Sequence, residues 1–270
     1  MDISLFWNTI IISPLTNILL IIYQIAFSNY GLAIILFTCL IRLVTHPLMV
    51  QQIKGAQAMQ DMQKDPRYVA LQAKHKGDKQ KLQEEQAKMM QELKINPLAS
   101  CLPTLIQFPI IIGLYQVIIL ALANSPMQLE NLIRHIYPRF INVATLIPLN
   151  STFLWMDLSQ PERLFIPGIQ IGIPVLAIIV VITTYMQSKM MTPTSSNSGD
   201  QSAMVGNMMN IYMPFLMGYL ALTLASGLAL YFVVSNLIGI FQYAMLGKLN
   251  WRNLLPMRKS SAVVKGGTKK

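Results

Sequence analysis

The sequence predicts an all-α membrane protein: five transmembrane helices, an N-terminal amphipathic helix in the membrane interface and a cytoplasmic helical hairpin. Hydrophobic residues make up 53% of the 270 positions and charged residues only 12%, whereas a soluble domain is about 25% charged. Several apolar stretches approach the ~20 residues that an α-helix needs to cross the bilayer core. Basic residues flank these stretches instead of forming one basic face, which argues against a soluble nucleic-acid-binding domain.

The N-terminal segment, residues 1–29, is apolar but interrupted by polar residues. Four of these fall within about 60° of one another on a helix, at 100° per residue: Ser13, Asn17, Gln24 and Ser28. Pro14 suits the first turn of a helix. We therefore expect an amphipathic helix over residues 14–27 that lies in the extracytoplasmic membrane interface. An additional spanning helix is the alternative.

The first transmembrane helix is predicted over residues 30–50, YGLAIILFTCLIRLVTHPLMV. Its 21 residues would extend roughly 31 Å, enough to cross the bilayer core. Pro47 is expected to kink the cytoplasmic end of this helix. Arg42 lies near the middle of the stretch, where a charged side chain costs about 2.5 to 3.5 kcal/mol on insertion scales. Protein or water must therefore compensate this charge.

Residues 51–96 differ sharply in composition, with nine Lys or Arg and six Asp or Glu among many Gln and Met residues. Apolar positions at helical spacing occur before and after residues 75–78, whose sequence HKGD predicts a turn. We expect an antiparallel helical hairpin on the cytoplasmic side. A solvated loop with helical propensity is the alternative.

The rest of the chain alternates between apolar stretches and polar connections. Four more spans are predicted, at residues 97–123, 168–191, 208–224 and 228–246. They are joined or followed by an extracytoplasmic segment at 124–167, a cytoplasmic loop at 192–207 and a basic cytoplasmic tail at 247–270. Three prolines make the second span irregular: Pro97, Pro103 and Pro109. Trp155 and Tyr137 suit a membrane interface.

The distribution of basic residues supports this topology. Seventeen of the 21 Lys and Arg residues would face the cytoplasm, three would lie outside (Arg134, Arg139 and Arg163), and Arg42 would lie within the membrane. This asymmetry satisfies the positive-inside rule. We expect a multi-pass protein of the bacterial cell membrane with its N-terminus outside and its C-terminus in the cytoplasm.

No set of residues indicates catalysis. His46, His75 and His135 fall in three different compartments of the predicted topology, so they cannot easily join a nucleophile. The sequence has no HExxH motif and no glycine-rich phosphate loop. The predicted spans contain no Asp or Glu, which proton relays and cation pathways usually employ. We therefore expect no enzyme activity, cofactor or metal site.

The neighbours of Arg42 can be estimated from depth along each span. Thr38 shares its helix face, and six other polar side chains lie at a similar depth: Gln107, Thr183, Thr184, Gln187, Ser235 and Asn236. None of them is negatively charged, so we expect Arg42 to face water in a cavity open to the cytoplasm. Backbone carbonyls freed at Pro103 and Pro109 are an alternative source of hydrogen bonds.

Several blocks of sequence resemble the YidC family of membrane protein insertases, in its short five-span form. They are YGLAII from Tyr30, IRL around Arg42, PL at Pro47, the Gln/Lys/Met-rich hairpin, NPL at Asn96 leading to Pro103 and QFP, and SGLALY from Ser226 followed by SN. The resemblance covers roughly residues 14–247. The position after the last tyrosine of SGLALY, often Trp in this family, is Phe232 here, which weakens any argument resting on that aromatic ring.

This resemblance implies an insertase and chaperone that inserts nascent membrane proteins without nucleotide or cofactor. The arginine that matches Arg42 lies in a hydrophilic groove that opens to the cytoplasm and the lipid. We expect the groove residues to be Arg42, Thr38, Gln107, Thr184, Gln187, Ser235, Asn236 and Phe232. The implied partners are nascent membrane proteins, the lipid bilayer, ribosomes and targeting factors that meet the hairpin and basic tail, and a Sec-type translocon.

Two other functions are compatible with parts of the sequence. A small channel or carrier for an anionic solute would use Arg42 as its binding charge, but the outer halves of the predicted spans offer almost no polar lining. A scaffold whose hairpin binds partners would leave Arg42 without a role.

Overall fold

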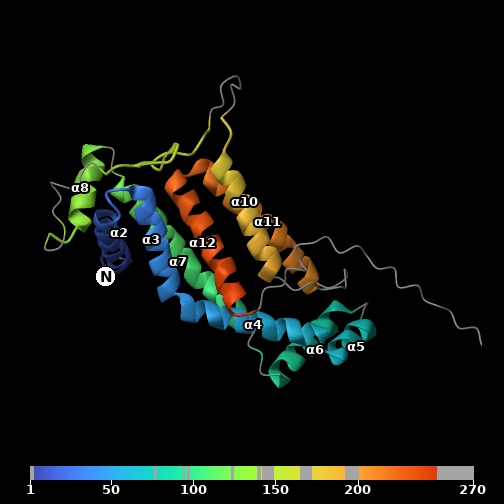
Figure 1. Ribbon diagram of the computed structural model, residues 1–270. Helices are drawn as coiled ribbons and strands as arrows, with labels where there is room; N and C mark the ends of the chain where they lie inside the picture. The colour runs from blue at the N-terminus through green and yellow to red at the C-terminus, as the bar shows by residue number, and fades with distance from the viewer. Residues whose placement is uncertain are drawn as a thin grey trace, which may run out of the picture.

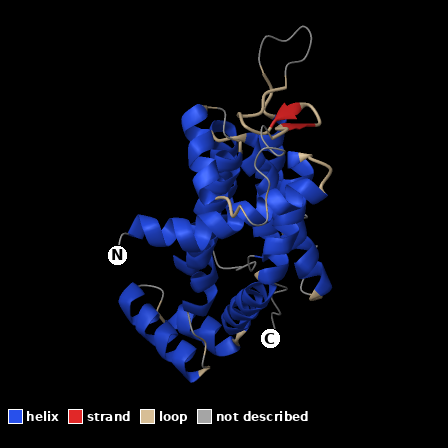
Figure 2. Cartoon of the chain, turned by 90° about the vertical axis from the view of Figure 1, so that its left-hand side faces the viewer, coloured by secondary structure: helices blue, strands red, loops and turns tan. Residues whose placement is uncertain are grey.

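The computed structural model describes residues 3–75, 78–93, 95, 98–122, 125–138, 141, 149–164, 172–191 and 201–247. Helices dominate this part of the chain, and its strands form a short hairpin at one end of the helix bundle (Figures 1 and 2). We call this the hairpin end. The predicted tail at 247–270 lies almost wholly outside the described residues.

The N-terminal segment forms an unbroken helical run made of α1 (Ile3–Trp7), the π-helical turn η1 (Asn8–Ile12) and α2 (Ser13–Ile25). Part of the polar stripe contacts protein. Asn17 is buried, donates to the backbone oxygen of His135 at 2.8 Å and accepts from the backbone N–H of Tyr137 at 2.7 Å. This stripe therefore does not by itself place the helix in the interface, and Ser4–Ile25 is also long and apolar enough to cross a membrane.

The predicted first span is broken. Helix α3 (Tyr30–Val44) ends before α4 (His46–Lys64), and the two helices meet at 59°. The break at Thr45 comes two residues before Pro47, which cannot donate a backbone hydrogen bond to the carbonyl of Leu43. We call this break the elbow. Arg42 consequently lies in the last turn of α3, just before the elbow, and not within an unbroken helix.

The charged region at 51–96 forms three helical pieces rather than a simple two-helix hairpin. The long helix α4 is followed by α5 (Pro66–Lys74) and, after the predicted turn, by α6 (Lys79–Glu92). Asp65 and Asp78 cap α5 and α6 by accepting backbone N–H groups at 2.9 and 3.2 Å. A small cluster of Met62, Tyr68 and Met89 holds these helices together, away from the rest of the bundle (Figure 1).

Helix α7 (Leu98–Ala121) covers most of the predicted second span. It is one continuous helix of 24 residues through Pro103 and Pro109, so the irregularity that the sequence predicts does not interrupt it.

The segment after α7 contains helix α8 (Pro126–His135) and a hairpin of β1 (Thr152–Phe153) and β2 (Met156–Asp157). The strands are antiparallel, with Thr152 opposite Asp157. The hairpin packs on the start of α3, where Phe153 lies against Gly31.

The last three helices are α10 (Val175–Met191), α11 (Gln201–Thr223) and α12 (Ser226–Met245). Two boundaries differ from prediction. Helix α10 begins at Val175, seven residues after the expected start at 168, and most of the intervening residues lie outside the described part. Helix α11 begins at Gln201, so 201–207 is helix and not loop. Its Ala and Met residues favour helix despite the polar composition.

The whole arrangement confirms the all-α membrane class but not the count of five spans. Among the described residues, Ser4–Ile25 and Ser226–Met245 are long and apolar enough to cross a membrane, and the bent pair α3–α4 could form a third span. Three further apolar helices are shorter: Pro109–Ala121, Val175–Met190 and Ile211–Thr223.

Helix α12 occupies a central place in the bundle. It packs against α3, α7, α10 and α11, and Figure 1 shows it between α3 and the pair α10–α11. Its first seven residues, 226–232, are all buried. Side chains on opposite faces of α12 can therefore contact different neighbouring helices.

Candidate functional site: polar contacts around α12

Arg42 contacts α12 through Ser235. Its Nε donates to Ser235 Oγ at 2.9 Å, and its second terminal nitrogen donates to the same oxygen. The other terminal nitrogen lies 3.7 Å from the sulfur of Met49, just beyond the elbow. Ser235 is buried and Arg42 is half-buried. Among the estimated neighbours whose side chains the structure describes, Ser235 is thus the one that hydrogen-bonds to Arg42.

Asn236, the next residue of α12, faces a different helix. Its side-chain Nδ2 donates to Thr183 Oγ1 at 3.1 Å and to Thr184 Oγ1 at 2.8 Å, both on α10. Thr183 is buried, and Thr184 and Asn236 are half-buried. The two consecutive residues Ser235 and Asn236 therefore connect α12 to α3 and to α10.

Gln187 also lies against α12. Its Nε2 is 2.6 Å from the position that a Cβ atom on Gly239 would occupy. The absence of a side chain at Gly239 therefore allows Gln187 to approach the α12 backbone. Gln187 and Thr184 are both on α10, so this helix presents two of the predicted groove residues to α12.

The other predicted groove residues are placed differently. Thr38 is fully buried, and its hydroxyl donates to the backbone oxygen of Ile34 in its own helix at 2.6 Å, so it does not bond to Arg42. Phe232 is buried beside Tyr231, with ring centroids 5.7 Å apart. The backbone of Gln107 belongs to α7, and its side chain lies outside the described part of the structure.

Sequence reasoning missed Gln242. Its side-chain Nε2 lies 3.4 Å from the backbone oxygen of Arg42 and 3.2 Å from Nδ1 of His46. Gln242 follows Ser235 by seven residues, or about two helical turns, and so lies on the same face of α12. That spacing is a signal that could have found it.

No carboxylate compensates Arg42 among the residues that the structure describes. The ion pairs seen there lie elsewhere: Arg67–Asp65, Lys81–Asp78, Lys88–Glu85 and Arg134–Glu130. The guanidinium of Arg42 donates to a neutral hydroxyl instead. Within the described residues, its positive charge is therefore not balanced by a carboxylate.

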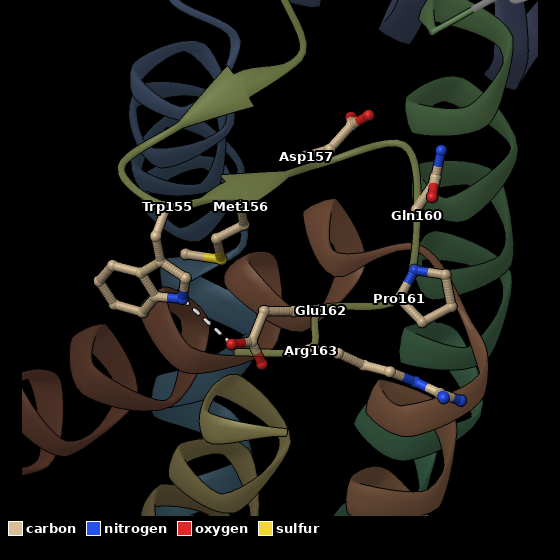
Figure 3. A pocket seen from close by; sticks show the side chains of 7 residues that line it. All are labelled: Trp155, Met156, Asp157, Gln160, Pro161, Glu162 and Arg163. Carbon is tan, nitrogen blue, oxygen red and sulfur yellow. Dashed lines mark hydrogen bonds between the residues drawn. The ribbon is translucent and has the colours of Figure 1, made fainter. Parts of the chain in front are cut away.

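The hairpin end is tied to the helix bundle by hydrogen bonds. Glu162 accepts from Trp155 Nε1 at 3.0 Å (Figure 3) and from the backbone N–H of Leu176, at the start of α10, at 3.1 Å. The backbone N–H groups of Ser226 and Gly227, at the start of α12, donate to backbone oxygens of the segment after β2 at 2.9 and 3.1 Å. The first turns of both helices are thus attached to this segment.

A cavity of about 390 Å³ lies in the same segment. Figure 3 shows the residues that line it: Trp155, Met156, Asp157, Gln160, Pro161, Glu162 and Arg163. None of the side chains that contact Arg42 lines this cavity. The Asp157 carboxylate is partly buried, which opposes its ionisation, but hydrogen bonds from Ser159 and Ser151 hold its pKa below the usual range.

These features define a class: an all-α membrane protein with a positively charged, polar site between its helices. Within the described residues, no group of three or more His, Cys, Asp or Glu side chains could hold a metal ion. The chemistry available at the site is hydrogen bonding and charge attraction.

Comparisons with known proteins identify the family. The 60Kd inner membrane protein family matches residues 21–252. The chain is 32% identical over 248 residues to "Membrane protein insertase YidC" of Oceanobacillus iheyensis, covering 90% of this chain and 84% of that protein. It is 33% identical over 268 residues to "Membrane protein insertase YidC 1" of Halalkalibacterium halodurans, covering 98% and 86%. The chain therefore belongs to the 60Kd inner membrane protein family, with the YidC insertases, which confirms the resemblance seen in the sequence.

A solved structure supports the same fold. The chain resembles a crystal structure titled "Active YidC insertase crystal structure with the first transmembrane domain resolved", with a TM-score of 0.51 and 26% sequence identity. The match covers 83% of this chain and 43% of that one, so the chain spans less than half of the solved protein.

Proposed function

We propose that this protein is a membrane protein insertase that passes nascent membrane proteins into the lipid. Its relatives are named as insertases over most of its length. The single observation that supports the mechanism is the guanidinium of Arg42, held by Ser235 and not neutralised by a carboxylate among the described residues. A positive charge in surroundings of low dielectric attracts acidic groups more strongly than it would in water.

In this proposal, the polar segment of a client enters a hydrophilic groove beside Arg42, and its hydrophobic segment moves along the helices into lipid. Arg42 uses three of its five N–H groups in the contacts seen here, so further donors remain for a client. The hydroxyls and amides of Ser235, Asn236, Thr184 and Gln187 would line this groove with Gln107, and the buried Thr38 and Phe232 would pack behind it.

The shortness of α3 supports a locally thin membrane at this site. Its 15 residues extend only about 22 Å, compared with a hydrocarbon core of about 30 Å. A short span thins the bilayer around it. The barrier that a polar client segment must cross would be lower there.

The hairpin end supports a groove closed on one side over a channel for an anionic solute. A channel needs a path that passes both ends of the helices. Here the first turns of α10 and α12 are bonded to the segment that follows β2. The groove would then open at the opposite end of the bundle, near the elbow. We place this end toward the cytoplasm because α4–α6 and the tail hold most of the basic residues.

The same charge distribution supports a bacterial cell-membrane topology with the N-terminus outside and the C-terminus in the cytoplasm. In this topology, α4–α6 and the basic tail would meet ribosomes and targeting factors, because basic segments suit ribosomal RNA. A Sec-type translocon would be a further partner in the membrane. No enzymatic step or cofactor is needed.

The test is insertion by the purified full-length protein in lipid vesicles, with two matched clients. One client has an acidic translocated segment, and the other has the same segment with Asn and Gln at the acidic positions. Arg42→Gln should lower insertion of the acidic client about tenfold, or about 1.4 kcal/mol, and affect the neutral client little.

Arg163→Gln is the matched control, because Arg163 is an exposed arginine at the hairpin end. It should leave both clients unchanged. If Arg42→Gln inserts the acidic client and the neutral client as well as the wild type does, the charge of Arg42 has no role in insertion. Solute flux without insertion would favour the channel.

A further inference from the structure

The C-terminal part of α12, which lies beside the elbow, makes a second contact with Arg42. Ser235 accepts from the guanidinium, and Gln242 approaches the backbone carbonyl of the same residue, with Nε2 and the carbonyl oxygen 3.4 Å apart. Seven residues of helix extend about 10.5 Å, and residues seven apart lie on one face. One face of α12 therefore holds Arg42 at both ends, by its side chain and by its backbone.

The amide of Gln242 has a fixed orientation in this contact. Its Nε2 faces the carbonyl oxygen of Arg42 and Nδ1 of His46 at 3.2 Å. A carbonyl oxygen can only accept, so nitrogen must be the amide atom that faces it. The opposite amide atom, Oε1, is buried and has no hydrogen-bond partner among the described residues.

An unpaired buried acceptor destabilises a fold. Gln242 is only 8% exposed, so Met or Leu would suit a position needed for packing alone. Buried polar groups left unsatisfied in a native structure need an explanation, and a functional role is one of them. The contacts made by Nε2 therefore point to a role other than stability.

Neighbouring residues join the elbow to the same end of α12. Met49, whose sulfur contacts the guanidinium, packs with Ile53 and Tyr243 in a small buried cluster. Tyr243 is the residue next to Gln242 on α12. The elbow is therefore fixed to α12 immediately beside the backbone of Arg42.

We propose that Gln242 is a positioning residue for Arg42. It holds the Arg42 carbonyl at the elbow, so that the guanidinium stays at Ser235. Long basic side chains near helix ends otherwise extend toward the membrane surface, where water solvates the charge. This inference rests on the proposed function, in which the position of the Arg42 charge decides how well acidic clients insert.

The test is Gln242→Met, which keeps the length of the side chain and removes both polar atoms of the amide, Oε1 and Nε2. The readouts are the ratio of insertion of the acidic client to the neutral client, and the thermal unfolding midpoint. We expect the ratio to fall roughly threefold to tenfold, the range that one net hydrogen bond supports. The unfolding midpoint should change little, because the loss of the unpaired acceptor offsets the loss of the contacts made by Nε2.

Two further variants complete the test. Gln51→Met, at an exposed position of α4, is the matched control and should change neither readout. Gln242→Glu keeps the size but offers no donor and adds a negative charge near Arg42, so it should abolish the preference for acidic clients.

An unchanged ratio in folded Gln242→Met would overturn the inference. A lower midpoint with equal loss of both clients would also overturn it, since that is the result of a merely structural residue. If Arg42→Gln itself leaves the ratio unchanged, the charge role in the proposed function fails, and this inference fails with it. If Arg42→Gln lowers the ratio and Gln242→Met does not, only this inference fails.

Discussion

Ser235 and Asn236 are adjacent in α12 but hydrogen-bond to different helices. Ser235 Oγ accepts from Arg42 on α3 at 2.9 Å, and Asn236 Nδ2 donates to Thr184 on α10 at 2.8 Å. Adjacent residues on a helix point about 100° apart, so one pair of positions can reach two neighbours. This pair makes α12 the polar connection between the helices on either side of it.

Asn236→Leu should loosen α10 from α12. It removes the donors to Thr183 and Thr184, and the Thr183 hydroxyl keeps its bond to the Ile179 carbonyl in its own helix. Hydrogen bonds between membrane helices average about 0.6 kcal/mol, with a maximum near 1.7, so we expect a loss of about 1 kcal/mol. The free energies of unfolding of Asn236→Leu, Thr184→Val and the double variant would measure the coupling energy between these two side chains. Fully additive effects would contradict a direct bond.

Ser235→Ala should affect Arg42 directly. The guanidinium loses the only side-chain oxygen that it contacts in the described part of the structure. We expect insertion of the acidic client to fall several-fold, or about 1 kcal/mol, which is less than for Arg42→Gln because the positive charge remains. Thr223→Val on the exposed face of α11 is a control that removes a hydroxyl far from Arg42. If Thr223→Val lowers insertion of the acidic client as much as Ser235→Ala does, the loss does not come from the contact between Ser235 and Arg42.

The sequence predicts the residue types of this site better than their contacts. Depth along the spans placed Ser235 near Arg42, and the structure joins them. Thr38 was expected to share a polar face with Arg42, but a threonine within a helix can donate to the carbonyl four residues earlier, and Thr38 does so. Gln242 contacts Arg42 across 200 positions of sequence, and its spacing of seven residues from Ser235 is the signal that could have indicated this pairing.

The depth of Arg42 illustrates a second limit. Apolar residues continue from Tyr30 to Val50, so hydropathy predicts one span with Arg42 near its middle, and Pro47 predicts only a kink at its cytoplasmic end. Pro47 removes one backbone donor, and the helix breaks at Thr45, two residues earlier. Hydropathy measures the composition of a stretch and does not register a missing N–H group. The class of protein follows from composition, but the position of the charge follows from this one proline.

The carboxyl group of Asp65 should titrate below its ordinary pKa of 3.8. A hydrogen bond from the Arg67 side chain is the largest cause, followed by one from the Arg67 backbone. A lowered pKa in the folded state means that the capping interaction is fully present above pH 3.8 and is lost as the pH falls through the lower, folded-state value. The start of α5 should therefore fray only in strong acid.

Carboxyl-carbon NMR titrations of the full-length protein would measure this effect. Arg67→Ala should raise the midpoint of Asp65 toward its ordinary value. Asp78, whose pKa is also lowered, mainly by the backbone N–H of Lys81, is the internal control and should not move. Equal shifts of both midpoints would mean that the local contact with Arg67 is not the cause.

Gly31→Ala should separate the β1–β2 hairpin from the start of α3. A Cβ atom at this position would lie 2.1 Å from two ring atoms of Phe153, closer than any real contact. Overpacking of this kind typically destabilises by about 1 to 3 kcal/mol. Phe153→Ala, which removes the ring, should recover part of the loss when it is combined with Gly31→Ala. A double variant whose stability equals the sum of the two single losses would contradict the contact.

Glu162→Ala should release both Trp155 and the first turn of α10. The carboxylate is 8% exposed and accepts from Trp155 Nε1 and from the backbone N–H of Leu176. A carboxylate at a helix N-terminus satisfies a free N–H group and complements the helix dipole, so its loss should cost about 1 to 2 kcal/mol.

The indole of Trp155, half of which is already exposed, should become more mobile in this variant, and its fluorescence should shift to longer wavelength. In a Trp7→Phe, Trp251→Phe background Trp155 is the remaining one of the three tryptophans, so the emission reports on this residue alone. Glu130→Ala, which removes an exposed carboxylate from α8, is the control, and an equal spectral shift in that variant would disprove the role of Glu162.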